Sequence, residues 1–264
     1  MSEHDEHNNQ SQSETHHAGN PEAKPGSFDP DRFYFRQLLS GLDFGAGDQV
    51  AEGMANFAYL IGDRASGECV VVDPAYAVAE LKAIAEADGM QIAGALVTHY
   101  HPDHCGGEMM GISIEGASQL LDIAQVPIHV QSTEKEWILK STSLSATDLA
   151  LHDPGDVVTV GELPIQLIHT PGHTPGSQCF LVNGCLVSGD TLFLDGCGRT
   201  DLPGGDPEAL YYSLTQTLSQ VPDDSVLFPG HNYSSRPAQR MGDTRRNNRV
   251  FMPDSAEQWL AMFG

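Results

Sequence analysis

Thr98-His99-Tyr100-His101-Pro102-Asp103-His104 places three imidazoles and one carboxylate within six consecutive positions, 99–104. The stretch directly follows a short apolar run at 92–97, which we interpret as a buried strand. Loops at the carboxyl ends of strands commonly carry the sites of α/β proteins. Imidazoles and carboxylates are ligands for zinc, iron and manganese. The spacing therefore predicts that His99 and His101 converge on one ion, whereas Asp103 and His104 face a second.

The segments around this stretch predict a βαβ unit within a larger two-sheet fold. Residues 69–73 and 92–97 are strand-like, and apolar positions at helical spacing predict a helix at 77–87. Further strands are expected at 33–39, 56–61, 126–130 and 226–228, hairpins at 157–168 and 179–187, and helices at 114–124, 132–139, 206–219 and 255–263. This order predicts two sheets covered by helices on their outer faces.

Three further motifs each place a histidine or an aspartate at the carboxyl end of a predicted strand. His173 lies between two Pro-Gly pairs, which restrict the backbone around it. Asp190 follows the strand that leaves an Asn-Gly turn, and His231 follows the strand at 226–228. Together with the first stretch, these residues predict one shared metal site.

With these motifs the chain resembles the metallo-β-lactamase superfamily over roughly residues 33–252. The resemblance implies an α/β (α+β) fold, an αββα sandwich with the site at one edge of its two sheets. It implies that one metal is bound by His99, His101 and His173, and a second by Asp103, His104 and His231, with Asp190 bridging both. Aspartate rather than cysteine at position 190 is similar to the hydrolase and oxygenase branches.

Smaller motifs resemble the glyoxalase II and persulfide dioxygenase branch. They are Arg36-Gln37, residues 58–64 and residues 195–201, of which Gly198-Arg199-Thr200-Asp201 is nearer to persulfide dioxygenases. Only 33 residues follow His231, too few for the helical C-terminal domain that contacts glutathione in glyoxalase II. We expect Arg199 and Asp201 to form a buried ion pair that supports the loop beneath Asp190 rather than to contact substrate.

The number of ligands favours a hydrolase with two divalent ions, most simply zinc. Two such ions about 3.5 to 4 Å apart share and acidify a water, so metal-bound hydroxide is available near neutral pH. A thioester carbonyl would be polarised by one ion, as in hydroxyacylglutathione hydrolases. We expect Asp103 to orient the nucleophile and Asp190 to serve both ions, which makes these two residues the expected catalytic carboxylates.

The principal alternative is a mononuclear iron dioxygenase that acts on a thiol persulfide. By resemblance, His99, His173 and Asp190 would supply the arrangement of two histidines and one carboxylate that binds such iron. Lactone hydrolysis remains open because it needs the same nucleophile. A non-catalytic metal-binding or sensing protein is disfavoured by the complete ligand set. A nuclease or phosphodiesterase is disfavoured by the acidic composition.

Composition indicates the partners and the compartment. The formal net charge of −23 over 264 residues repels phosphodiester backbones, so no nucleic-acid partner is expected. No apolar stretch approaches the ~20 residues of a membrane helix, and the N-terminus lacks the pattern of a secretory signal. Five cysteines without C-x-x-C spacing favour a reducing cytoplasm. We expect a small thiol-derived substrate, and homo-oligomerisation remains open.

The two ends of the chain differ in character. Residues 1–30 have almost no apolar side chains, so we expect a disordered tail with solvated histidines, followed by a single domain at 31–264. Five arginines follow His231, namely Arg236, Arg240, Arg245, Arg246 and Arg249. They either offset neighbouring carboxylates or anchor an anionic substrate. His129, His152 and His169 are expected to be hydrogen-bonded structural residues.

Overall fold

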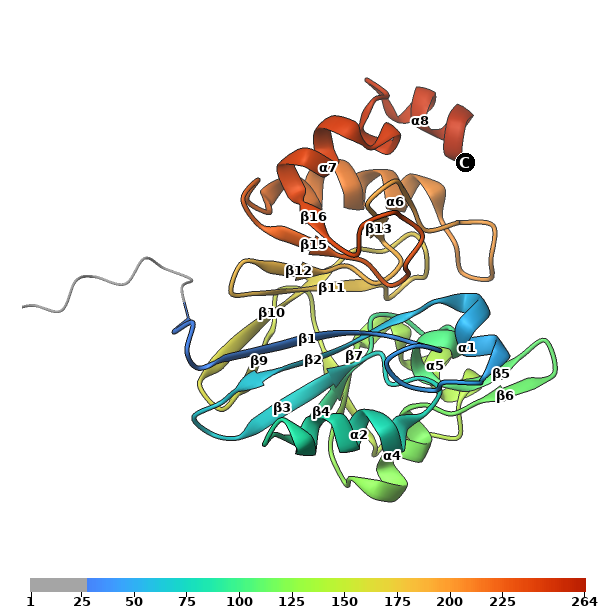
Figure 1. Ribbon diagram of the computed structural model, residues 1–264. Helices are drawn as coiled ribbons and strands as arrows, with labels where there is room; N and C mark the ends of the chain where they lie inside the picture. The colour runs from blue at the N-terminus through green and yellow to red at the C-terminus, as the bar shows by residue number, and fades with distance from the viewer. Residues whose placement is uncertain (1–27) are drawn as a thin grey trace, which may run out of the picture.

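A computed structural model of the protein describes residues 28–264. Figure 1 shows two facing sheets with helices on the outer face of each, which confirms the predicted αββα sandwich. The expected disorder of the tail lies outside the described residues up to position 27. Phe28, by contrast, belongs to the fold, because its ring packs on the core between the sheets and its N–H donates to Asn183 Oδ1.

The first sheet has six strands in the order β1-β2-β3-β4-β7-β8. Their bounds are β1 Phe33–Leu39, β2 Phe57–Asp63, β3 Glu68–Val72, β4 Gln91–Leu96, β7 Ile128–Gln131 and β8 Leu149–His152. The β1–β2 and β2–β3 pairs are antiparallel, and the remaining pairs are parallel. Helix α2 (Val78–Ala87) connects the parallel strands β3 and β4, which is the predicted βαβ unit.

The second sheet also has six strands, in the order β16-β15-β12-β11-β10-β9. Their bounds are β9 Val157–Val160, β10 Leu163–His169, β11 Gln178–Val182, β12 Cys185–Val187, β15 Val226–Phe228 and β16 Gln239–Arg240. Only β12 and β15 pair in parallel within it. Asn183 and Gly184 have φ values of +44° and +78°, so the Asn-Gly turn has the positive-φ backbone that a two-residue hairpin requires.

Short helices and hairpins complete the chain. The α-helices are α1 Gln49–Met54, α3 Pro102–Cys105, α4 Ala117–Ile123, α5 Lys135–Ser141, α6 Pro207–Tyr212, α7 Met241–Asn247 and α8 Ala256–Phe263. The small hairpins are β5 Gly107–Met109 with β6 Ile112–Ile114, and β13 Leu192–Phe193 with β14 Gly196–Cys197. A π-helical turn at Ser213–Thr217 and 3₁₀ turns at Ser132–Glu134, Leu218–Gln220 and Arg249–Phe251 occupy other connections. None of the helices within residues 28–264 is long and apolar enough to cross a membrane.

Two predicted helices have different bounds in the structure. The helix expected at 114–124 begins only at Ala117, because Ile114 pairs with Gly107 in the β5–β6 hairpin. The helix expected at 206–219 is α6 followed by the π-helical and 3₁₀ turns. The 3₁₀ turn at Ser132–Glu134 precedes α5, and it is capped by Gln131 rather than by Ser132.

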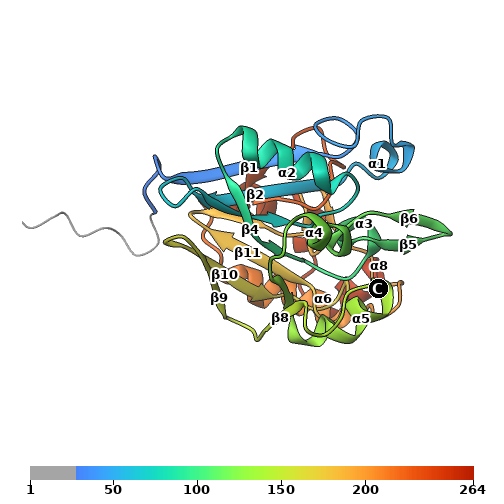
Figure 2. The ribbon, with the colours of Figure 1, turned by 90° about the horizontal axis from the view of Figure 1, so that it is seen from below.

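Strand β2 is buried on both faces, and this explains the layered core. Successive side chains of a strand point to opposite faces. Leu60 faces the outer cluster that includes Leu81 of α2, whereas Tyr59 and Ile61 face the second sheet. Trp259 of α8 covers the outer face of that second sheet. Figure 2, seen from below, shows the β5–β6 hairpin projecting from the end of the sandwich where α3 lies.

Candidate metal centre

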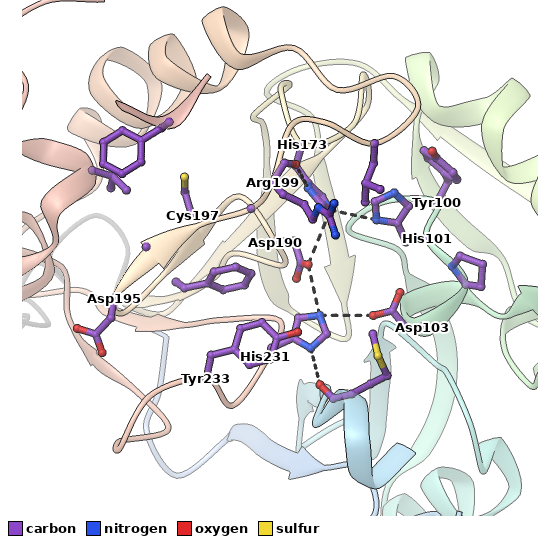
Figure 3. A pocket seen from close by; sticks show the side chains of 18 of the residues that line it. Tyr100, His101, Asp103, His173, Asp190, Asp195, Cys197, Arg199, His231 and Tyr233 are labelled. Atoms are coloured by element: carbon purple, nitrogen blue, oxygen red, sulfur yellow. Dashed lines mark hydrogen bonds and ion pairs between the residues drawn. The ribbon is translucent and has the colours of Figure 1, made fainter. Parts of the chain in front are cut away.

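The seven predicted metal ligands lie together, each just past the carboxyl end of a strand. His99 and His101 follow β4, and Asp103 and His104 lie on the one-turn helix α3 that comes next. His173, Asp190 and His231 follow β10, β12 and β15 respectively. Because these strands end at the same edge of the sandwich, the two sheets bring all seven side chains into one site. Figure 3 shows those that line the cavity: His101, Asp103, His173, Asp190 and His231.

His99, His101 and His173 form the first group of potential ligands. His99 Nε2 and His173 Nε2 each lie 3.0 Å from His101 Nδ1. Burial lowers the pKa of all three imidazoles, with His101 reaching about 4. Neutral imidazoles at neutral pH have lone pairs available for a metal.

The second group consists of Asp103, His104 and His231. His104 Nε2 lies 3.2 Å from His231 Nε2, and Asp103 Oδ2 lies 3.4 Å from each of these nitrogens. The side chain of His104 is fully buried. Burial alone would lower the pKa of His104, but the carboxylates of Asp190, Asp103 and Asp73 raise it to about 10.

Asp190 lies between the two groups. Its Oδ1 is 3.4 Å from His104 Nε2, and its Oδ2 is 3.3 Å from His231 Nε2 and 3.7 Å from His173 Nε2. Burial would raise the pKa of Asp190, but His231 and His104 hold it well below its ordinary value. A β-carbon at Gly230 would lie 2.4 Å from Asp190 Oδ1, so glycine is required beside this carboxylate.

The chemistry of this donor set fits two divalent cations. Asp190 Oδ1 is buried without a hydrogen-bond partner among the described residues, which is costly unless a cation lies beside it. Five imidazoles bring their lone-pair nitrogens toward two carboxylates, and no lysine or arginine of the described chain forms an ion pair with either carboxylate. A cation would take the place of the proton that the carboxylates otherwise attract to His104.

The second ring nitrogen of most of these histidines is held by a hydrogen bond. His173 Nδ1 donates to Arg199 O at 2.7 Å, and His231 Nδ1 donates to Met54 O at 2.8 Å. His104 Nδ1 lies 2.9 Å from Asp73 Oδ2. Such contacts select the tautomer and orientation in which Nε2 is free to bind a metal.

Asp73 supports the site but was not among the predicted residues. It follows β3, is buried, and accepts hydrogen bonds from Thr98 N and Thr98 Oγ1, both at 2.7 Å. Thr98 Oγ1 in turn lies 2.9 Å from His99 Nδ1, so Asp73 orients both His99 and His104. The sequence carried a related signal, because Asp73 ends the predicted strand at 69–73 and an aspartate at the carboxyl end of a strand was the pattern used for Asp190.

Asn56 and Glu134 are two further residues that the sequence reasoning missed. Asn56 Nδ2 donates to Asp103 Oδ2 at 3.1 Å, and Asn56 Oδ1 accepts from Tyr76 Oη at 3.0 Å. Glu134 is buried and accepts from Tyr100 N and Thr174 Oγ1, which ties the loop of His99 to the loop of His173. Neither residue has a local sequence pattern that distinguishes it, since each acts on a loop distant in sequence.

The expectation of a buried Arg199–Asp201 ion pair is wrong. The pair exists, with two nitrogen–oxygen distances of 2.7 Å, but the two side chains are 64% and 68% exposed. Arg199 lines the cavity, and both side chains reach solvent. Position 199 supports the site through its backbone, because its carbonyl oxygen accepts the hydrogen bond of His173.

The five arginines after His231 do not form one cluster at the site. Arg245 bonds the carbonyls of Leu218 and Val221 and pairs with Asp223, while Arg246 pairs with Asp243 at 2.6 Å. Arg236 and Arg240 are exposed away from the cavity. Of these five arginines, only Arg249 lines the cavity that contains the potential metal ligands.

The other described histidines make hydrogen bonds elsewhere. His129 Nδ1 lies 2.9 Å from His152 Nε2, and His169 Nε2 donates to Pro175 O at 2.9 Å. These contacts agree with the structural roles predicted for all three. The histidines of the tail, His4, His7, His16 and His17, lie outside the described residues.

A cavity of about 710 Å³ opens onto the candidate metal centre. His101, Asp103, His173, Asp190 and His231 form its floor (Figure 3). Most other lining side chains are apolar or aromatic: Met54, Tyr100, Pro102, Met109, Met110, Phe193, Leu202, Pro203, Tyr233, Val250 and Phe263. The volume suits a ligand of metabolite size.

Comparison with known proteins agrees with this geometry. A family model described as "Metallo-beta-lactamase superfamily" matches residues 51–231, the interval that contains all seven potential ligands. Among solved structures, ETHE1 from Myxococcus xanthus has a TM-score of 0.71 and 27% identity, covering 87% of this chain and 89% of that one.

Two curated relatives illustrate two activities. Human "Persulfide dioxygenase ETHE1, mitochondrial" is 29% identical over 212 residues, which are 79% of this chain and 76% of that protein. The "Hydroxyacylglutathione hydrolase" of Pseudomonas fluorescens (strain SBW25) is 34% identical over 179 residues, which are 68% of this chain and 62% of that protein. The match to the hydrolase therefore leaves more than a third of that relative uncovered.

Proposed function

The chain belongs to the metallo-beta-lactamase superfamily, and we propose that it is a metal-dependent hydrolase that cleaves a thioester. The relatives of the chain include a hydrolase and a dioxygenase. The proposal rests above all on the second ligand group, since Asp103, His104 and His231 gather their donor atoms as closely as the first group does. In the mononuclear alternative these three side chains would remain without a metal. The expected ions are two zinc ions, which suit imidazole and carboxylate ligands.

Two bound divalent ions supply an acidified water and an electrophilic partner for the carbonyl oxygen. The chain's own residues hold the reacting groups around them. Asp103 lines the cavity while Asn56 fixes its Oδ2, so its carboxylate is oriented to accept a proton from water. Hydrolysis forms a carbon–oxygen bond from water and breaks the carbon–sulfur bond, and the proton leaves with the thiol. The reaction needs no oxidant.

The test is an assay of the zinc-loaded protein against S-lactoylglutathione and a panel of aryl and alkyl thioesters under anaerobic conditions. We expect release of free thiol from at least one thioester without oxygen, and loss of this activity in His231→Ala. Hydrolysis that is unchanged in His231→Ala, or absent from every thioester, would contradict the proposal.

Persulfide dioxygenase activity is the second candidate. It is favoured by the similarity to human "Persulfide dioxygenase ETHE1, mitochondrial", which covers 79% of this chain and 76% of that protein. His99, His173 and Asp190 could hold one iron, with His173 Nε2 and Asp190 Oδ2 already 3.7 Å apart. The distinguishing assay is oxygen uptake by the iron-loaded protein with glutathione persulfide. Uptake that survives His231→Ala would favour this candidate over the hydrolase.

A further inference from the structure

The cavity wall above the metal ligands is unusually apolar for a site expected to accept a peptide-like thiol. Met109 and Met110 of the β5–β6 hairpin line one part of it, and Phe193, Val250 and Phe263 line another. Tyr233 stacks on His231, with ring centroids 4.6 Å apart and an interplanar angle of 8°. These side chains offer few hydrogen bonds to a ligand, so they favour an apolar group.

Besides the potential metal ligands, three charged side chains line the cavity: Asp195, Arg199 and Arg249. Two of them have partners. Arg199 is bonded to Asp201 through two nitrogens, and Asp195 accepts a hydrogen bond from Ser234 Oγ at 2.7 Å. Arg199 and Asp195 therefore have fewer hydrogen-bonding atoms available for a ligand.

Arg249 is the third of these charged side chains. Within residues 28–264 its guanidinium makes no ion pair with a carboxylate and no side-chain hydrogen bond, and it lies 5.8 Å from the centroid of the Phe263 ring. An available guanidinium is notable in a chain with a formal net charge of −23. Its planar fork can bind both oxygens of a carboxylate, and the adjacent ring can cover the apolar part of the same ligand.

We propose that the cavity selects a thiol-derived substrate with a bulky apolar group and one carboxylate, and that Arg249 binds this carboxylate. The proposal rests on the thioesterase function inferred above and assigns its substrate class. A glutathione derivative fits less well, because it brings two carboxylates, an ammonium and two peptide groups. Most of these would face the apolar wall without hydrogen-bond partners, at a cost in affinity.

The binding test uses thioethers, which cannot be hydrolysed, so that it does not depend on turnover. One series carries a phenethyl group on the sulfur and a carboxylate at the end of alkyl chains of graded length. A second series has the same chains as methyl esters, and S-phenethylglutathione represents the peptide class. Calorimetry with the metal-loaded protein should show the best carboxylate binding about 10- to 100-fold more tightly than its methyl ester.

Arg249→Ala should abolish this preference while leaving the affinity for the methyl ester unchanged. Arg249→Lys should retain part of it, because the charge remains but the fork is lost. The matched control is Arg246→Ala, which removes an exposed arginine of the same segment that pairs with Asp243 outside the cavity. That control should bind as the wild type does, and melting curves verify that each variant is folded.

The phenylacetyl thioesters of the same mercapto acids provide the kinetic test. Arg249→Ala should raise KM for the carboxylate substrate with little change in kcat, which indicates loss of binding shared by ground state and transition state. The substrate assignment is overturned if S-phenethylglutathione binds more tightly than every carboxylate thioether, or if Arg249→Ala keeps the wild-type preference. If the thioethers bind as expected but no thioester is cleaved, the hydrolase function fails while the assignment of Arg249 stands.

Discussion

Asp190 is the residue that links the two ligand groups most directly. It lies within 4 Å of His104 and His231 of one group and of His173 of the other, and among residues 28–264 its Oδ1 has no hydrogen-bond partner. Asp190→Ala should therefore abolish turnover and lower the amount of bound metal, because one carboxylate serves both ions. Activity assays and elemental analysis check this. A variant with full metal content and near wild-type turnover would show that Asp190 is not a ligand.

Asp73 supports a potential metal ligand instead of being one. Its carboxylate lies 2.9 Å from His104 Nδ1 and accepts a hydrogen bond from Thr98 Oγ1. Asp73→Asn should lower metal affinity by about 10- to 100-fold, the usual effect of losing a carboxylate behind a ligating histidine. Competition with a chromophoric chelator measures this affinity. Asp122→Asn, a change on the exposed side of α4, is the matched control. Equal metal affinity in the two variants would contradict the role assigned to Asp73.

For single residues, the sequence predicted which histidines and aspartates lie together, but it did not predict the contacts that support them. His99, His101, Asp103 and His104 are adjacent in sequence, so their spacing alone predicted convergence. Asn56 acts on Asp103 across 47 positions, and no local pattern marks such a contact. Arg199 and Asp201 form the ion pair that their closeness in sequence predicted. The exposure of the two side chains was not predicted, because it depends on the path of the loop.

Helix α8 is the element that closes the outer face of the second sheet beside the cavity. Trp259 is fully buried, donates from Nε1 to Val250 O at 3.1 Å, and packs against Phe263. Trp259→Ala should lower the free energy of unfolding by about 3–5 kcal/mol, as expected for removal of a buried aromatic side chain. Urea denaturation measures this change. Met262→Ala, on the exposed side of the same helix, should stay within about 0.5 kcal/mol of wild type.

Elements with a regular apolar pattern were predictable, and elements formed by tertiary contacts were not. The helix expected at 77–87 is α2, Val78–Ala87, because its buried residues Val78, Leu81 and Ala85 recur at helical spacing. Helix α3 is a single turn within the ligand loop, too short for any periodicity to show. The β5–β6 hairpin was missed because Ile114 continues the apolar pattern of the following helix.

The two sheets are also connected at the end away from the metal ligands, through Asp63. This buried carboxylate at the end of β2 pairs with Arg32 and accepts hydrogen bonds from Ala65 N at 3.0 Å and Glu162 N at 3.1 Å. Glu162 belongs to the turn between β9 and β10, so the contacts span both sheets. The Arg32 guanidinium holds the pKa of Asp63 at about 2, below its ordinary value of 3.8.

Asp63→Asn should lower the midpoint of urea-induced unfolding at pH 7, because the ion pair with Arg32 is lost. The folded-state pKa is depressed, so this stabilisation is present above pH 3.8 and is lost as the pH falls toward about 2. The difference between wild type and variant should therefore shrink across that interval. A difference that is constant from pH 7 to pH 2 would mean that the charge of Asp63 does not contribute.

We infer that the whole molecule assembles a centre for two metal ions. The decisive measurement is elemental analysis of protein purified without added metal, in the wild type and in His231→Ala. We expect about two zinc ions per chain in the wild type and about one in the variant, since His231 belongs only to the second ligand group. A wild-type protein with about one iron per chain, unchanged in His231→Ala, would contradict this inference.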